Sequence, residues 1–180
     1  RSLEHFFGVK RLSHRFPSEK LAEKHWLSHY IISTVRHPFD RYISWYVGMV
    51  KSQEKNSLVK KHGEGIFDLS PFEFWDLVKP MNRFSSMQQN WTNFPSSEKP
   101  EADLILRFEE ISSWTILLER AGFRLLDKNL PHVGKSVIGK QSNLETLDMT
   151  NTEINILRTK VEEHFASDYA YFGYKFGTLS

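Results

Sequence analysis

The distribution of apolar residues first predicts a strand, a turn and a helix. An apolar run at residues 31–35 (IISTV), rich in β-branched side chains, predicts a buried strand that ends at Arg36. Pro38 ends this strand, because its ring fixes φ and biases the preceding residue toward extended geometry. A helix rich in aromatic residues is expected from there to about Val50, with Asp40 as its N-cap or as an acid in its first turn.

The rest of the chain predicts a second strand and further helices. Residues 103–110 (DLILRFEE) predict a strand, and a helix over residues 111–122 follows it. Helices are also expected over residues 18–25 and 150–165, while the Lys-rich segment 51–65 is expected to be an exposed loop or a frayed helix end. Two strands, each followed by a helix, fit an α/β fold with a parallel sheet and helices on its faces.

The junction after the first strand has the chemistry of an anion-binding site. In open α/β units, ligands bind at the carboxyl end of a strand, where the N–H groups and the dipole of the next helix favour a negative charge. The planar guanidinium of Arg36 can bind two phosphate oxygens, and the hydroxyl of Ser44 on the helix can donate to a third. The residues therefore predict a phosphate-binding site.

The same junction carries a motif. The spacing Arg-x-Pro-x-x-Arg-x-x-Ser-x-Tyr, held by Arg36, Pro38, Arg41, Ser44 and Tyr46, resembles the 3′-phosphate-binding motif of sulfotransferases that use 3′-phosphoadenosine 5′-phosphosulfate (PAPS). The resemblance implies that Arg36 and Ser44 hold the 3′-phosphate of this cofactor. For Arg41 we expect a bracing role, through acidic or backbone partners, rather than direct contact with the phosphate.

Other segments resemble the same family in the same order along the chain. They are an amphipathic segment (residues 70–75), a Gln-rich helix (87–91), an aliphatic strand with Arg-Phe-Glu (103–110), a loop that closes over the cofactor (130–136) and a C-terminal signature (168–174). The resemblance is closest to the carbohydrate sulfotransferases of the membrane-associated, Golgi type and their microbial or viral relatives. It implies that Lys135 and Ser136, in the closing loop, contact a phosphate of the nucleotide.

The resemblance also implies a fold. It is a P-loop-kinase-like three-layer fold, with a central parallel sheet flanked by helices, in a single domain over residues 1–180. Such enzymes begin with a strand and a P-loop that holds the 5′-phosphosulfate. Neither residues 8–10 (GVK) nor residues 134–136 (GKS) have the strand-to-helix context of that loop. Because the chain begins with Arg1, we expect the N-terminal strand and the P-loop to lie outside this sequence.

Sulfuryl transfer needs a base for the acceptor hydroxyl, and His14 is the candidate. A neutral imidazole titrates near the working pH, which suits proton abstraction from a sugar hydroxyl. The relatives that modify glycans have such a histidine between the P-loop and the 3′-phosphate strand, where His14 lies. The alternative is a histidine at the surface or in a helix cap. His25 and His29 have the i,i+4 spacing of a metal site, but no third ligand is evident and we expect no metal.

Composition bears on the class of protein, on its partners and on its cellular location. A hydrophobic content of 39% is enough to form a hydrophobic core of ordinary size. A net charge of +2 is too small to indicate a nucleic-acid partner. The chain has no cysteine, which excludes disulfides, thiolate zinc sites and a cysteine nucleophile and favours a cytoplasmic, microbial or viral setting over the Golgi lumen. No apolar run approaches the roughly 20 residues that cross a bilayer.

Three classes of function stay open. We expect a sulfotransferase that moves a sulfonate from PAPS, without a metal, to a hydroxyl of a carbohydrate or related acceptor. A catalytically incomplete nucleotide- or glycan-binding module of the same fold is the second class. The third is a P-loop phosphotransferase, which needs an NTP-binding loop, a Mg²⁺-binding Ser or Thr and an acidic partner. The sequence shows none of these three features.

Overall fold

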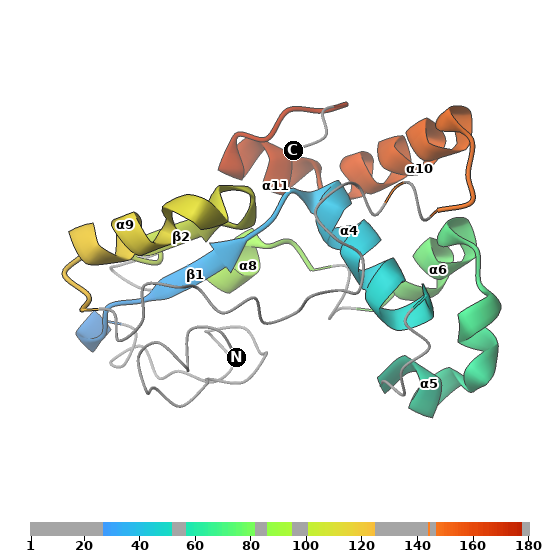
Figure 1. Cartoon of the computed structure of the whole chain (residues 1–180), viewed down its shortest axis with the longest axis horizontal. Coiled ribbons are helices and arrows are strands. Elements are labelled where there is room, and N and C mark those ends of the chain that lie inside the picture. The colour runs from blue at the N-terminus through green and yellow to red at the C-terminus, as the bar shows by residue number, and fades with distance from the viewer. Residues whose placement is uncertain are drawn as a thin grey trace. The chain divides into compact units, whose positions relative to one another are not determined.

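The structure is a computed structural model that describes residues 27–51, 57–81, 86–94, 101–124, 144 and 147–177 (Figure 1). The chain forms two compact units, which are described one at a time. The first comprises residues 1–36 and 88–134, and the second comprises residues 37–87 and 135–180. Helices and a small parallel sheet give a mixed α/β structure, which agrees with the fold class expected from the sequence.

The sheet of the first unit consists of β1 (Ile32–Val35) and β2 (Leu104–Arg107), which run parallel. Val35 lies opposite Arg107, so the two strands end at the same edge of the sheet. Asp103 fixes the start of the pair, because its Oδ2 accepts a hydrogen bond of 2.6 Å from the backbone N–H of the residue before β1. The parallel pairing confirms the prediction made from the two apolar runs.

Three short helices accompany these strands. α8 (Gln89–Thr92) contacts β1, and the 3₁₀-helix η3 (Phe108–Ser113) leads from β2 into α9 (Trp114–Arg120). The sequence predicts one helix over residues 111–122, whereas the structure has two helical segments, the first of which begins at Phe108, before the predicted start. The first segment is irregular, since Glu110 inside it leaves helical geometry with φ −103° and ψ 27°.

The core of the first unit lies between β2 and α9. It contains Leu106, Trp114 and Leu118, each almost fully buried. The indole N–H of Trp114 donates a hydrogen bond of 2.6 Å to the carbonyl of Arg107, the last residue of β2. This contact fixes α9 at the carboxyl end of the strand, which is the edge where the sequence predicts the anion site.

The second unit begins with α4 (Pro38–Tyr46), which continues as a π-helical turn, η1 (Val47–Lys51). This extent confirms the helix predicted to about Val50. His37 is the N-cap residue and Asp40 is an acid in the first turn, so the second of the two expected roles of Asp40 is the observed one. An acid in the first turn stabilises the positive end of the helix dipole.

Three further helical segments follow, namely α5 (Ser57–His62), η2 (Glu64–Asp68) and α6 (Pro71–Val78). α5 lies within residues 51–65, where the sequence predicts an exposed loop or a frayed helix end. The two lysines of α5 are indeed exposed, but Leu58 is only 3% exposed. One buried leucine therefore anchors a helix in a segment whose polar composition suggests a loop.

α10 (Asn151–His164) and α11 (Ala166–Phe172) complete the second unit (Figure 1). α10 confirms the helix predicted over residues 150–165, and it packs against α4 and α11. The centre of this unit is rich in aromatic side chains. The residues that form it include Phe39, Tyr42, Ile43, Tyr46, Phe74, Trp75, Leu157, Val161, Phe165 and Tyr169.

The start of α10 gives a first testable prediction. Thr150 Oγ1 accepts a hydrogen bond of 3.3 Å from the N–H of Glu153, whose carboxylate in turn accepts one of 2.8 Å from the N–H of Thr150. Replacing Thr150 with alanine should lower the free energy of unfolding by about 1 kcal/mol, because helix N–H groups lose their cap. Thermal unfolding measures this, with Thr152→Ala, an exposed threonine of the same helix, as the control.

The same cap is sensitive to acid. Hydrogen bonds from the Thr150 side chain and backbone lower the pKa of Glu153 from its ordinary value of 4.5. The stabilisation from this carboxylate is therefore present above that value and is lost as the pH falls through the lowered pKa. The effect of Thr150→Ala should accordingly be larger at neutral pH than in strong acid, and an effect that is equal at both would contradict the cap.

Candidate active site

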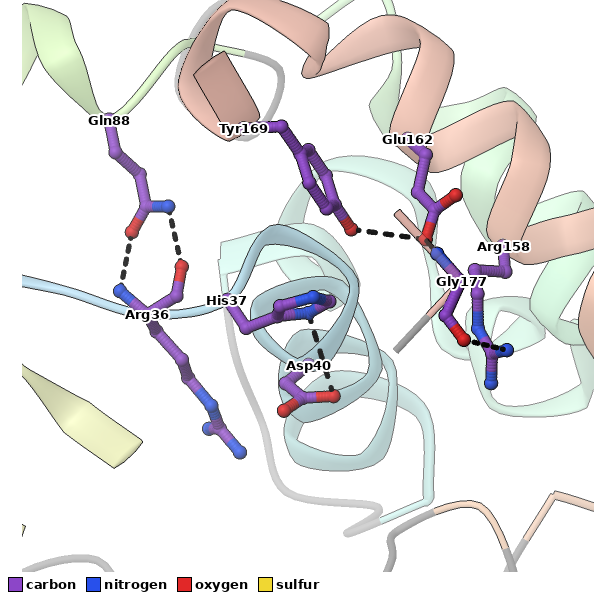
Figure 2. Close-up of polar contacts among 8 residues, drawn as sticks. All are labelled: Arg36, His37, Asp40, Gln88, Arg158, Glu162, Tyr169 and Gly177. Atoms are coloured by element: carbon purple, nitrogen blue, oxygen red, sulfur yellow. Dashed lines mark hydrogen bonds and ion pairs between the residues drawn. The ribbon is translucent and has the colours of Figure 1, made fainter. Parts of the chain in front are cut away.

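The candidate site begins at Arg36, which links the end of β1 to the start of α4. Two hydrogen bonds join the backbone of Arg36 to the side chain of Gln88, which is only 5% exposed. The N–H of Arg36 donates to Gln88 Oε1 at 2.9 Å, and Gln88 Nε2 donates to the carbonyl of Arg36 at 2.6 Å (Figure 2). The amide of Gln88 thus holds both polar groups of one residue at the end of the strand.

The side chain of Arg36 extends away from Gln88 (Figure 2). Its Cζ lies 4.8 Å from the centroid of the Phe108 ring, which is 45% exposed. Phe108 directly follows β2 and Arg36 directly follows β1, so both come from the carboxyl ends of parallel strands. A cation beside an exposed ring is held in place by the ring's negative face. This edge therefore presents a guanidinium and an aromatic surface together.

His37 occupies the turn that precedes α4. Its side chain is almost fully buried, and its ring lies edge-on to Tyr169 and Tyr174 at 5.2 Å between centroids. Nδ1 of His37 lies 4.0 Å from Oδ1 of Asp40 (Figure 2). A ring enclosed in this way packs the turn, and its burial argues against a role as a base that meets a substrate.

Arg41 lies one turn into α4 and is held inside the second unit. Its Nη2 donates a hydrogen bond of 3.0 Å to the carbonyl of Ser86, and its guanidinium lies over the rings of Trp45 and Phe165. Burial lowers the pKa of Arg41 to about 10, against the opposing effect of Asp168, so the group stays charged at neutral pH. These contacts agree with the expectation that Arg41 braces the motif through backbone and acidic partners.

The comparisons with known proteins identify the family. The model of the sulfotransferase family matches residues 3–175, nearly the whole chain. This chain belongs to the sulfotransferase family. Membership indicates that the protein transfers a sulfonate group to a hydroxyl-bearing acceptor. No match was found among curated proteins, and none among solved structures.

The structure describes only some of the residues that the sequence assigns to the sulfotransferase site. Ser44 lies on α4 and is half-buried, and Arg36 lies at the end of β1. They belong to different units, so each is placed within its own unit only. The candidate base His14 and the closing-loop residues Lys135 and Ser136 lie outside the described residues, and their roles stay predictions.

Tyr46, the last residue of the motif, belongs to the hydrophobic core of the second unit of the sulfotransferase. It is 1% exposed, and its hydroxyl donates a hydrogen bond of 3.0 Å to the carbonyl of Leu69. The ring also packs edge-on against Phe74 of α6. Tyr46 therefore joins α4 to the segment that leads into α6.

Sequence reasoning missed two residues beside Arg36. Gln88 stands in the Gln-rich segment that resembles the sulfotransferase family, but the sequence did not show that its amide binds a backbone 52 residues away. Phe108 belongs to the predicted second strand, and its exposure follows from its position just beyond the strand end. A signal for Phe108 was available, because an aromatic residue next to a charged strand end is a recognisable ligand-facing position.

Among the described residues of the sulfotransferase, no group of three or more His, Cys, Asp or Glu side chains is placed to hold a metal ion. Among the same residues, none of the helices combines the length and the apolar character that a membrane crossing requires.

Proposed function

We propose that this sulfotransferase transfers a sulfonate from PAPS to a hydroxyl of a carbohydrate or related acceptor by in-line displacement. The acceptor oxygen forms a new bond to sulfur while the bond from sulfur to the 5′-phosphate oxygen breaks. The bonding electrons leave with 3′-phosphoadenosine 5′-phosphate (PAP), and the hydroxyl proton passes to a base. His14 is the proposed base, because a neutral imidazole can accept this proton near neutral pH.

The proposal assigns the nucleotide phosphates to four residues. Arg36 and Ser44 are proposed to bind the 3′-phosphate, because they occupy the arginine and serine positions of the family motif. Lys135 and Ser136 are proposed to bind a phosphate from the closing loop. The proposal also includes a three-layer, P-loop-like fold, in a cytoplasmic setting that the absence of cysteine favours, with the Golgi lumen as the alternative.

The observation that carries the proposal is the guanidinium of Arg36 beside the exposed ring of Phe108. Ligands of open α/β sheets bind at the carboxyl ends of the strands, and both residues directly follow such ends. A guanidinium binds a phosphate through two parallel hydrogen bonds, and an exposed ring offers a surface on which a nucleotide base can stack. The combination supports an anionic nucleotide as the ligand.

Two measurements test the proposal. Calorimetric titration should show that PAP binds and that ATP binds more weakly, since only PAP carries a 3′-phosphate. Incubation with PAPS and a panel of carbohydrates, followed by mass spectrometry, should show sulfated product that forms equally well in the presence of a metal chelator. PAP binding without any product would favour the binding module. Magnesium-dependent phosphate transfer from ATP would favour a phosphotransferase and contradict the proposal.

A further inference from the structure

We infer that Gln88 is a positioning residue for Arg36 and that, through the backbone of Arg36, it sets the affinity for the 3′-phosphate. The inference rests on the proposed function, in which Arg36 binds that phosphate. It concerns a residue that belongs to a different segment of the chain from the phosphate motif. Both residues lie in the first unit, and the two hydrogen bonds between them are drawn in Figure 2.

The geometry of the contact is reciprocal. Gln88 Oε1 accepts from the N–H of Arg36, and Gln88 Nε2 donates to the carbonyl of the same residue, at 2.9 and 2.6 Å. Arg36 comes directly after β1, whose last pair with β2 joins Val35 to Arg107. The side-chain amide thus gives Arg36 the donor and the acceptor that the peptide of an adjacent strand gives within a sheet. Glutamine is suited to this because its amide carries both groups.

The orientation of the Arg36 backbone also determines where the guanidinium of Arg36 lies. The direction of the Cα–Cβ bond follows from φ and ψ, so a rotation of this peptide would move the side chain away from the ring of Phe108. Gln88 is 5% exposed, and a buried backbone group that loses its partner is costly, which keeps the peptide in a single orientation. A guanidinium that is already held in its binding position before the anion arrives loses less conformational entropy on binding.

The contacts of Gln88 indicate that it positions Arg36 and does not bind the phosphate itself. Its Oε1 and Nε2 engage the Arg36 backbone, while the Arg36 side chain extends in another direction (Figure 2). The amide is also uncharged, so it adds no repulsion toward a bound phosphate. Glutamate at this position would keep an acceptor for the Arg36 N–H, but it would place a carboxylate against the Arg36 carbonyl. Gln88→Glu therefore removes half of the contact at nearly constant side-chain volume.

A double-mutant cycle between the two residues tests the inference. The probe is PAP, and its dissociation constant is measured by calorimetry for the protein, for Gln88→Ala, for Arg36→Ala and for the double variant. Gln88→Ala should weaken PAP binding by about tenfold, the size expected for two lost hydrogen bonds. In the Arg36→Ala background the same change should have no further effect, because Gln88 acts only through Arg36. In turnover assays Gln88→Ala should raise the KM for PAPS more than it lowers kcat.

The control is Gln89→Ala, which removes the neighbouring amide of the same segment and should leave PAP affinity unchanged. If Gln88→Ala lowers the melting temperature, the Arg36→Ala background decides the question, because partial unfolding would weaken PAP binding in both backgrounds, whereas a loss of positioning weakens it only when Arg36 is present. Gln88→Glu should also weaken PAP binding. Unchanged affinity in both Gln88 variants, with affinity lost in Arg36→Ala, would overturn the inference and leave the proposed function intact. An equal loss from Gln88→Ala in both backgrounds would also overturn it. Normal PAP binding by Arg36→Ala would instead refute the proposed function.

Discussion

Replacement of Arg36 with alanine should reduce kcat/KM for PAPS by about 100-fold or more. The reason is that a bidentate guanidinium–phosphate contact contributes two charge-assisted hydrogen bonds, each of about 1.5–3 kcal/mol. Arg36→Lys should recover part of this loss, because a lysine keeps the charge but cannot bind two oxygens in parallel. Steady-state assays of sulfonate transfer measure both variants, and calorimetry with PAP measures the matching loss of affinity.

The same experiment can locate the contact on the nucleotide. Adenosine 5′-phosphate lacks the 3′-phosphate, so its affinity should be nearly the same for the wild-type protein and for Arg36→Ala, while the affinity for PAP falls. Arg120→Ala is the matched control, because Arg120 is an exposed arginine at the end of α9 in the same unit. An equal loss of affinity for both nucleotides would show that Arg36 does not act at the 3′-phosphate.

Replacement of Leu157 with alanine should lower the free energy of unfolding by about 2–5 kcal/mol. Leu157 is fully buried in the core of the second unit, where α10 packs against α4. The cost combines the lost burial of the side chain with the cavity that remains, because the surrounding aromatic residues cannot close it completely. Chemical denaturation monitored by circular dichroism gives the value.

The neighbouring residue provides the control for this prediction. Ile156 is an aliphatic residue of the same size in the same helix, but it is 48% exposed. Ile156→Ala should therefore cost less than about 1 kcal/mol. Similar losses from the two substitutions would mean that the face of α10 assigned to the core is wrong. A difference in the slope of the denaturation curve would indicate a change in the unfolded state instead.

The elements that the sequence predicted correctly are those with local signals. β1 has a β-branched run that ends at a charged residue and a proline, and α10 begins at a threonine followed three residues later by a glutamate. Such signals act within a few residues, so they need no knowledge of the rest of the fold. The parallel pairing also followed, because a helix between two strands favours that topology.

The parts that the sequence did not predict depend on distant contacts. The partner of the Gln88 side chain is a backbone 52 residues away, and any residue except proline at position 36 would present the same N–H and carbonyl. For the segment of α5 the sequence predicts a loop or a frayed helix end, because lysines dominate its pattern, whereas burial of Leu58 anchors a helix there. In both cases a single tertiary contact outweighs local composition.

The position of Tyr46 affects how relatives of this protein should be recognised. Its ring lies in the core and its hydroxyl holds the carbonyl of Leu69, and the guanidinium of Arg41 is likewise engaged by Ser86. Three of the five motif positions, counting Pro38 at the start of α4, therefore report that a chain adopts this fold. A gene that retains those three but has lost the arginine and serine at the positions of Arg36 and Ser44 would encode a folded protein without the proposed cofactor site. Genome searches should weight these two positions separately from the other three.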